Sequence, residues 1–295
     1  MPILRTLSGR AAAVAPALPV NRVLPAAAQR AVGPFVFLDH FGPASLSGDA
    51  SADVGPHPHI GLATVTYLLA GEMVHRDSIG TIQTIRPGDI NLMTAGRGVV
   101  HSERMPEWLL RERGRVEGLQ LWVALPQAQE DAAPSFQHVA RSDIPELVVG
   151  GAQVRVLVGS AFGKTSPVVA ASRTLHLDVT LPAGVTWELA VEEQQLAVYS
   201  PDGCLSIDGE SVGSRVMAVL QPGAYARLSC ESECRFIVIG GDSLAKPVHM
   251  WWNFVSTDIG KIEHAAQRWR QKQFPTVRGE TELVEMPSLP RLSPR

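Results

Sequence analysis

The chain has 295 residues, of which 45% are hydrophobic and 19% are charged, and its formal net charge is −3. This composition is typical of a soluble globular protein, and because no apolar run is long enough to cross a bilayer, we do not expect a membrane protein. The 26 basic residues are scattered among 29 acidic ones, so the sequence has no basic patch for direct binding of nucleic acid. The length favours two domains of ordinary size.

The first 38 residues superficially resemble an organelle transit peptide, because they contain arginines and many alanines but no acid. Prolines at positions 16, 19, 25 and 34 would interrupt an amphipathic helix there. The stretches "VNRVLP" and "GPFVFLDHFGP" instead have the pattern of strands and turns, and we expect His40 in the second of them to be a structural turn residue. We therefore assign this segment to the fold.

The cysteines indicate the cellular compartment. They are too few, and odd in number, for a disulfide framework, which favours a reducing environment and a cytoplasmic protein. They are Cys204, Cys230 and Cys234.

Short alternating runs separated by glycine and proline dominate residues 60–104, which predicts a succession of strands and turns. In "RPGD", Pro87 and Gly88 stand in the order that a type II turn requires. The stretch "GLQLWVALP", residues 118–126, places its leucines and valine on one face and predicts a half-buried antiparallel strand. The pattern is lost over residues 127–151, where we place a domain boundary.

The second half repeats this style, and its "LQPGAYARL" echoes "IRPGDINLM" in the turn and the strand that follows. We therefore predict an all-β protein of two tandem barrels, with domains at 1–135 and 145–295. Near the end, Ile259, Ile262, Ala266 and Trp269 have helical spacing and predict one amphipathic helix, after which comes Pro275. This helix and the preceding "WWNF" could cover the second barrel in a monomer.

Two pairs of polar residues in the first half have the spacing of metal ligands. Alternate residues of a strand project to the same face, so His57 and His59 of "GPHPHIG" would point together into the barrel. His101 and Glu103 of "HSE" have the same spacing. Each triplet occurs often by chance, but both lie beside strands and glycine-rich turns of one β-rich segment. We therefore predict one metal ion in the first barrel.

Three imidazoles and one carboxylate suit a borderline divalent metal, so Fe²⁺, Ni²⁺, Mn²⁺, Co²⁺, Cu²⁺ and Zn²⁺ are candidates and Ca²⁺ is not. Four protein ligands leave open coordination positions, which are typical of a catalytic centre. Fe²⁺ is our first choice because this ligand set matches non-haem iron chemistry with oxygen.

The chain resembles the pirin family of bicupins over nearly its whole length. The similar segments are "PFVFLDHFGP", "GPHPHIGLATVTYLLAGEMVHRDS", "PGDINLMTAGRGVVHSE", "GLQLWVALP", "LDVTLPAG" and "PVHMWWNFVS". The resemblance implies two cupin barrels of the jelly-roll type, with iron in the N-terminal one and no metal in the C-terminal one. It also implies that His57, His59, His101 and Glu103 are the metal ligands. In the second half, His176 is the nearest relic of a ligand, and we interpret it as a core or surface histidine.

The resemblance implies two functions. One is that of a quercetin 2,3-dioxygenase, an oxidoreductase that opens a flavonol with O2 and in which Glu103 would be the catalytic base. The alternative is a non-enzymatic, iron-dependent redox sensor that binds a transcription factor or metabolic enzyme. A metal-dependent sugar isomerase on the same fold would use similar ligands. We prefer the dioxygenase.

The chain departs from the family at two positions. Ala63 stands where a second acid is common, and Ala124 stands where Asn is usual. If the missing acid tunes the metal, substrate range or rate would differ here. Asn91 could project toward the metal or lie on the surface, while His75 and Asp77 could lie near the site or be solvated.

A competing motif is excluded by its context. "GESVG", residues 209–213, matches the pattern of a serine nucleophile, but a strand and a turn follow it rather than a helix. The glycines of "AGRGVVHS" are better explained by a tight turn that presents His101 than by phosphate binding.

Overall fold

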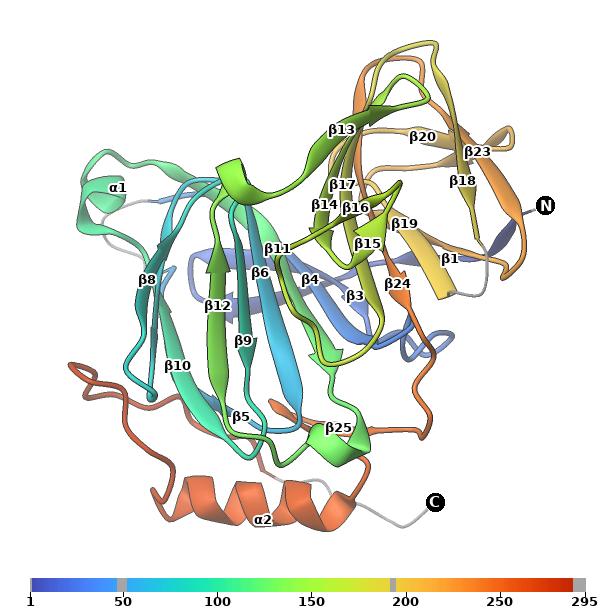
Figure 1. The fold of residues 1–295 in the computed structure, drawn as a ribbon. Coiled ribbons are helices and arrows are strands. Elements are labelled where there is room, and N and C mark those ends of the chain that lie inside the picture. The colour runs from blue at the N-terminus through green and yellow to red at the C-terminus, as the bar shows by residue number, and fades with distance from the viewer. Residues whose placement is uncertain (1, 47–51, 192–194, 289–295) are drawn as a thin grey trace.

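The computed structural model describes residues 2–46, 52–191 and 195–288. In these residues the chain forms two β-barrels, each made from a seven-stranded and a four-stranded antiparallel sheet (Figure 1). One long helix follows them. The predicted all-β class with two tandem barrels and a C-terminal helix is confirmed.

The first barrel contains the predicted metal ligands. Its larger sheet has the order β12-β9-β6-β11-β4-β3-β2, and its smaller sheet has the order β5-β10-β7-β8. The larger sheet comprises β2 (Arg10–Ala15), β3 (Leu18–Leu24), β4 (Phe35–Ser45), β6 (Leu62–Ala70), β9 (Ile90–Thr94), β11 (Arg115–Ala124) and β12 (Ser135–Val139). The smaller sheet comprises β5 (Val54–His59), β7 (Met73–Asp77), β8 (Ile82–Ile85) and β10 (Val99–Arg104), and the short helix α1 (Glu107–Arg111) follows it.

The second barrel repeats this plan. Its sheets have the orders β1-β22-β19-β24-β17-β14-β13 and β18-β23-β20-β21. The larger sheet comprises β1 (Ile3–Ser8), β13 (Glu146–Val149), β14 (Ala152–Val158), β17 (Thr174–Leu181), β19 (Gln195–Tyr199), β22 (Val216–Leu220) and β24 (Cys234–Gly241). The smaller sheet comprises β18 (Thr186–Ala190), β20 (Leu205–Ile207), β21 (Glu210–Val212) and β23 (Tyr225–Ser229), and a separate hairpin is formed by β15 (Ser160–Ala161) and β16 (Lys164–Thr165).

Both ends of the chain cross between the barrels. The N-terminal strand β1 pairs with β22 and so belongs to a sheet of the second barrel. After β24 the chain returns to the first barrel as the hairpin β25 (His249–Trp251) and β26 (Phe254–Ser256), followed by α2 (Ile259–Arg270). The division at 1–135 and 145–295 stays a prediction, and the two ends of the chain do not follow it.

The C-terminal helix forms where its apolar spacing predicts it. The Asp258 side chain accepts a hydrogen bond from the Gly260 N–H and caps the first turn. The buried face of α2 includes Ile262 and Trp269, and it packs with Ile60 and Val100 at the ends of β5 and β10. The expectation that this helix covers the second barrel is therefore wrong, because its apolar partners belong to the first barrel (Figure 1).

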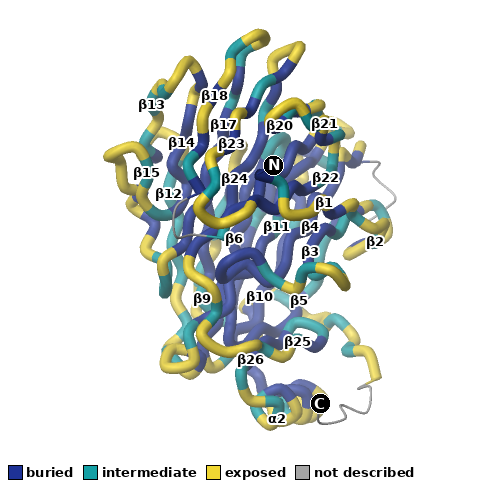
Figure 2. The backbone as a smooth tube through the Cα atoms, turned by 90° about the vertical axis from the view of Figure 1, so that its right-hand side faces the viewer, coloured by how far each residue is buried: buried dark blue, intermediate teal, exposed yellow. Residues whose placement is uncertain are grey.

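The strand β11 is buried on both faces, so the prediction of a half-buried strand is wrong. Leu119 and Leu121 pack in a core that also contains Tyr199 and Ile237 of the second barrel. The opposite face carries Trp122 into a different core cluster, inside the first barrel. The sequence pattern could not reveal that the second barrel covers the outer face. Figure 2 shows β11 and its neighbours as mostly buried strands between the two barrels.

A polar network also joins the barrels. The Tyr67 hydroxyl donates to Asp178, and the Arg235 guanidinium donates to both oxygens of the same carboxylate at 2.9 and 2.8 Å. These hydrogen bonds hold the pKa of Asp178 below its usual value, although its burial alone would raise that pKa. Burial of these groups is therefore compensated by mutual hydrogen bonding.

His40 belongs to a second polar contact between the barrels. It lies within strand β4 rather than in a turn, so the expectation of a turn histidine is wrong. Its Nδ1 is 2.9 Å from the Tyr199 hydroxyl of the second barrel, and its Nε2 is 3.1 Å from Glu117. It thus contributes to the contact between the barrels, and its purely structural role stays a prediction.

Among the residues that the structure describes, no helix is both long enough and apolar enough to span a membrane.

Candidate metal centre

Two neighbouring strands position the three candidate histidines. His57 and His59 lie on β5, and His101 lies on β10. The strands pair in antiparallel register with His101 directly opposite His57 and Val99 opposite His59. Because side chains alternate along each strand, all three imidazoles project to the same face. The turn before β10 depends on Gly96, whose φ is +50° and whose added Cβ would lie 2.0 Å from the Ala132 carbonyl oxygen.

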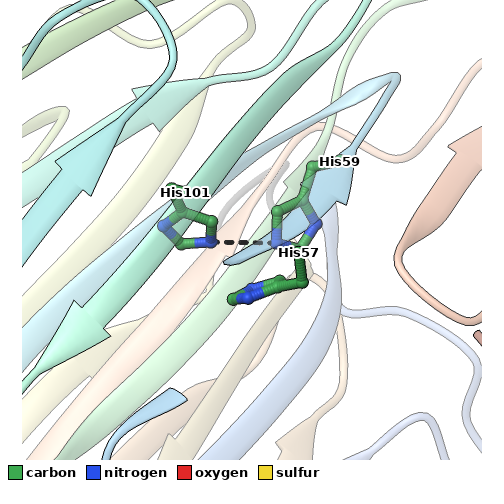
Figure 3. Close-up of side chains that lie close together, drawn as sticks. All are labelled: His57, His59 and His101. Carbon is green, nitrogen blue, oxygen red and sulfur yellow. Dashed lines mark hydrogen bonds between the residues drawn. The ribbon is translucent and has the colours of Figure 1, made fainter. Parts of the chain in front are cut away.

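The three imidazoles converge as the sequence predicts. One nitrogen of each ring lies within 4.8 Å of the corresponding nitrogens of the other two. The Nε2 atoms of His59 and His101 are 3.1 Å apart, the contact drawn as a dashed line in Figure 3. All three side chains are buried, and His101 has no exposed surface.

Hydrogen bonds fix which nitrogen of two rings carries the proton. His57 Nδ1 lies 2.8 Å from the Gly55 carbonyl oxygen, and His59 Nδ1 lies 3.1 Å from the Asn253 carbonyl oxygen. A carbonyl oxygen only accepts, so each Nδ1 must be protonated. In the neutral rings each Nε2 therefore presents a lone pair to the cluster.

A relay of side chains fixes the third ring. His75 Nε2 donates to Asp77 at 3.0 Å, which leaves His75 Nδ1 as an acceptor in the neutral ring. That atom lies 3.3 Å from His101 Nδ1, so His101 donates from Nδ1 and its Nε2 is unprotonated. Asp77 is held in turn by the backbone N–H groups of Ile79 and Thr81. We expected His75 and Asp77 either near the site or solvated. Both are buried, and His75 contacts His101, so the position near the site is confirmed.

The electrostatic environment keeps the imidazoles neutral. Burial lowers the pKa of His57 to about 4 and lowers the pKa values of His59 and His101 well below the usual value. Neutral imidazole is the form that binds a metal, and hydrogen bonds from the second ring nitrogen are typical of metal ligands.

These residues fit a divalent metal ion. Two Nε2 lone pairs that face each other at 3.1 Å repel unless a cation or a proton lies between them. The low pKa values disfavour the proton, whereas a divalent ion would accept all three lone pairs at once. The donor set suits borderline metals and does not select one of them.

Glu103 lies beside the three histidines. It is on the same strand as His101, in regular register with β7, but the pairing of β10 with β5 shifts so that Glu103 lies opposite Val54. Its carboxylate is buried and is not part of the cluster whose ligand atoms lie within 4.8 Å. Burial raises the pKa of Glu103 to about 7. Its roles as fourth ligand and as base stay predictions.

His57, His59 and Glu103 line a cavity of about 460 Å³. Phe37 and Trp122 stack on one another in its wall with ring centroids 4.0 Å apart, and the Arg22 guanidinium lies over Phe37. Arg22 also forms a bidentate ion pair with Asp39, with both N–O distances 2.7 Å. The cavity wall thus combines aromatic and aliphatic side chains with several polar and charged groups.

Two residues that we considered for the site do not line the metal cavity. Ala63 packs in the core between the barrels, so the idea that an acid at this position would tune the metal from nearby is wrong for this chain. Asn91 is buried on β9 in the larger sheet, where its Oδ1 is 2.7 Å from His138 Nδ1, and it does not line the cavity. Both lie on strands of the larger sheet, whereas the ligands lie on the smaller sheet.

The second barrel has no comparable centre in the part of the chain that the structure describes. Its interior is apolar and contains Trp187, Phe236 and many aliphatic side chains. His176 is fully buried, but it packs edge-on against Phe35 and Tyr67 at the interface between the barrels. Of the two environments we expected for it, the core is confirmed, and it does not occupy the position of a lost ligand.

Residues near the C-terminus contribute to the site in a way that the sequence patterns do not reveal. The Asn253 carbonyl, which orients His59, comes from the turn of the β25-β26 hairpin. Met250 and Trp252 of the same segment line the cavity. The unusual "WWNF" was the only signal in the sequence, and a backbone carbonyl leaves no signal in side-chain patterns.

The comparisons with known proteins agree with this geometry. The family model described as Pirin matches residues 17–123, and the model described as Pirin C-terminal cupin domain matches residues 176–275. A pirin-like protein of Caulobacter vibrioides is 42% identical over 254 residues, which cover 85% of this chain and 88% of that protein. A protein of Pseudomonas aeruginosa named "Putative quercetin 2,3-dioxygenase" is 35% identical over 91% of this chain and 84% of its own length. The crystal structure of a quercetin 2,3-dioxygenase from Acinetobacter baumannii superposes with a TM-score of 0.91 and 31% identity, covering 99% of this chain and 97% of that one.

Proposed function

The chain belongs to the pirin family, and from this premise we propose that it is a metal-dependent dioxygenase that cleaves quercetin or a related flavonol with O2. The observation that carries the proposal is the convergence of one ring nitrogen each from His57, His59 and His101, beside a cavity that has Phe37 and Trp122 in its wall. The similarity to proteins named as quercetin 2,3-dioxygenases supports this substrate class. It favours the enzyme over the redox-sensing regulator, our alternative.

We propose Fe²⁺ as the ion, with Ni²⁺, Mn²⁺, Co²⁺, Cu²⁺ and Zn²⁺ as possible replacements. His57, His59 and His101 would hold it through Nε2, and Glu103 would be the fourth ligand. When bound, the ion supplies Lewis-acid and redox chemistry for the reaction of the flavonol with O2. Such chemistry fits a site whose candidate ligands are buried.

The cavity walls would orient the planar substrate. Phe37 and Trp122 already stack on each other, and aromatic rings favour offset stacking or edge contacts with a further ring. The Trp122 ring also lies edge-on to His59, with centroids 5.2 Å apart. A flavonol against this wall would have one face covered by aromatic carbon while its polar edge faces the histidines.

Glu103 would act as the base. One carboxylate oxygen of Glu103 would accept the proton of the flavonol 3-hydroxyl, so that the substrate reacts as its anion. The carboxylate lines the same cavity as His57 and His59. It is thus available to a ligand.

The test is aerobic turnover of quercetin by iron-loaded protein, with detection of released carbon monoxide. We expect turnover by the wild type and loss of turnover in the double variant His101→Ala, Glu103→Ala. The matched control is Glu263→Ala, His264→Ala, a neighbouring pair exposed on α2, which should retain wild-type turnover. If the loaded wild type is no faster than the first double variant, the enzyme hypothesis fails.

A further inference from the structure

One wall of the metal cavity comes from the C-terminal end of the chain. Residues 277–286, here named the C-terminal strap, follow α2 and form neither helix nor strand. The strap places Val284 in the wall of the cavity that also contains His57, His59 and Glu103. It passes close to Gly55, at which an added Cβ would lie 3.5 Å from the side chains of Val284 and Glu282.

The backbone of Val284 is fixed by two hydrogen bonds. Its N–H donates to the Pro56 carbonyl oxygen at 2.9 Å, and its own carbonyl oxygen accepts from Trp269 Nε1 at 3.2 Å. Pro56 immediately precedes the ligand His57, and Trp269 belongs to the buried face of α2. Both polar groups of Val284 are therefore held, one by β5 of the first barrel and the other by α2.

Ion pairs hold the strap against the strand that carries His101 and Glu103. The Glu280 carboxylate accepts hydrogen bonds from the Ser102 hydroxyl at 2.8 Å and from Arg104 Nε at 3.1 Å, and Glu282 also pairs with Arg104. Hydrogen bonding to Arg104 holds the pKa of Glu280 below its usual value. Ser102 and Arg104 alternate with His101 and Glu103 along β10.

We propose that the C-terminal strap determines which ligands the metal cavity admits, because Arg104 and Pro56 hold it where Val284 limits the space in front of the histidines. The inference rests on the proposed function of the same cavity and names the residue that sets its substrate size. Pockets for drug-sized ligands usually have volumes of about 300 to 1,000 Å³. At about 460 Å³ this cavity lies near the lower end, so one added ring in its wall changes what fits.

The first test compares Val284→Phe with Leu283→Phe. Leu283 is the neighbouring strap residue, is exposed and does not line the cavity, so it is a matched control. The probes are quercetin and the smaller 4-nitrocatechol. Their binding to zinc-loaded protein is followed by the quenching of tryptophan fluorescence, to which Trp122 and Trp252 in the cavity wall contribute. We expect Val284→Phe to weaken quercetin binding at least about tenfold and 4-nitrocatechol binding much less, because overpacking penalises the larger ligand. Leu283→Phe should change neither.

The second test releases the strap. Glu280→Gln keeps the shape of the side chain but removes its charge, which weakens the pairing with Arg104. We expect faster proteolysis within residues 277–286 and a smaller preference between the two probes, with unchanged zinc content. Unchanged proteolysis and unchanged preference would contradict the role of the ion pairs in holding the strap.

The outcomes separate this inference from the proposed function, because probe binding to zinc-loaded protein needs no turnover. If iron-loaded protein releases no carbon monoxide from quercetin but Val284→Phe still discriminates between the probes, the dioxygenase proposal fails and the strap inference stands. If Val284→Phe and Leu283→Phe behave alike, or if neither probe binds the wild type, the strap inference is overturned even where turnover is observed.

Discussion

His59 Nε2 and His101 Nε2 lie 3.1 Å apart, and the hydrogen bonds at the opposite nitrogens leave both without a proton. Two lone pairs in this arrangement repel each other in a buried site. A shared cation turns that repulsion into attraction, so the same residues that destabilise the metal-free protein would stabilise the loaded one.

Metal removal should therefore lower the stability of the folded protein. A ligand that binds only the folded state at about 100 times its dissociation constant adds about 2.7 kcal/mol to the free energy of unfolding. We expect a chelator to lower the melting temperature of the wild type and added metal to restore it, as followed by calorimetry. His101→Ala should melt at the same temperature with and without chelator, and a chelator effect of equal size in this variant would contradict the site.

Asp77→Asn should weaken metal binding although Asp77 is not a proposed metal ligand. Asp77 accepts from His75, which in turn sets the protonated nitrogen of His101. Loss of such an outer partner typically costs about 10- to 100-fold in metal affinity. A competition titration with a chromophoric chelator measures the change. Asp208→Asn, which alters an aspartate of the second barrel paired with Arg227, is the control and should bind metal like the wild type.

Glu103→Gln should separate metal binding from turnover. The three histidines remain, so we expect the variant to retain metal, while the loss of the proposed base lowers the rate of flavonol cleavage by about 100-fold or more. Metal content and initial rates are measured on the same sample, with Glu263→Gln on the exposed face of α2 as the control. A variant that keeps both metal and full rate would show that Glu103 is not the base.

His176 should make stability depend on pH. Burial lowers its pKa from 6.5 to about 4. Within the described residues, neither ring nitrogen has a hydrogen-bond partner. Between pH 6.5 and 4 the unfolded chain binds a proton at this site that the folded chain does not, so the free energy of unfolding falls as the pH falls. The loss approaches about 3 kcal/mol at the lower end of this range.

The variant His176→Leu tests this prediction. It fills a similar volume without a titratable group, so it should lose less stability than the wild type when the pH is lowered from 7.5 to 5. Urea unfolding of both proteins at the two pH values, with equal metal loading, isolates the contribution of His176. Parallel losses in the two proteins would mean that another group causes the acid sensitivity.

The histidine cluster could be predicted from the sequence because the residue spacing that produces it lies within single short strands. His57 and His59 are two residues apart, as are His101 and Glu103. Because side chains alternate along a strand with a period of two, the members of each pair are expected on the same face. The resemblance to the pirin family then supplies the barrel that brings the two strands together. The amphipathic helix α2 could be predicted for the same reason, since its apolar spacing and its Asp258 cap both lie within one short segment of the sequence.

Contacts between distant segments could not be predicted from such patterns. The second face of β11, the position of His176 and the placement of α2 all depend on how the two barrels and the chain ends pack. The position of the strap could not be predicted either, because residues 277–286 have no strand or helix pattern. A backbone hydrogen bond from Val284 to Pro56 holds the strap, and Val284 lines the cavity. The cytoplasmic location and the monomeric state stay predictions.

The most direct test of the metal centre is a crystal structure of the protein purified without chelator, with anomalous diffraction recorded at the absorption edge of the metal found by elemental analysis. We expect one anomalous peak within about 2.0 to 2.2 Å of the Nε2 atoms of His57, His59 and His101. An absence of such a peak in metal-supplemented crystals, or a peak bound by other residues, would contradict the account.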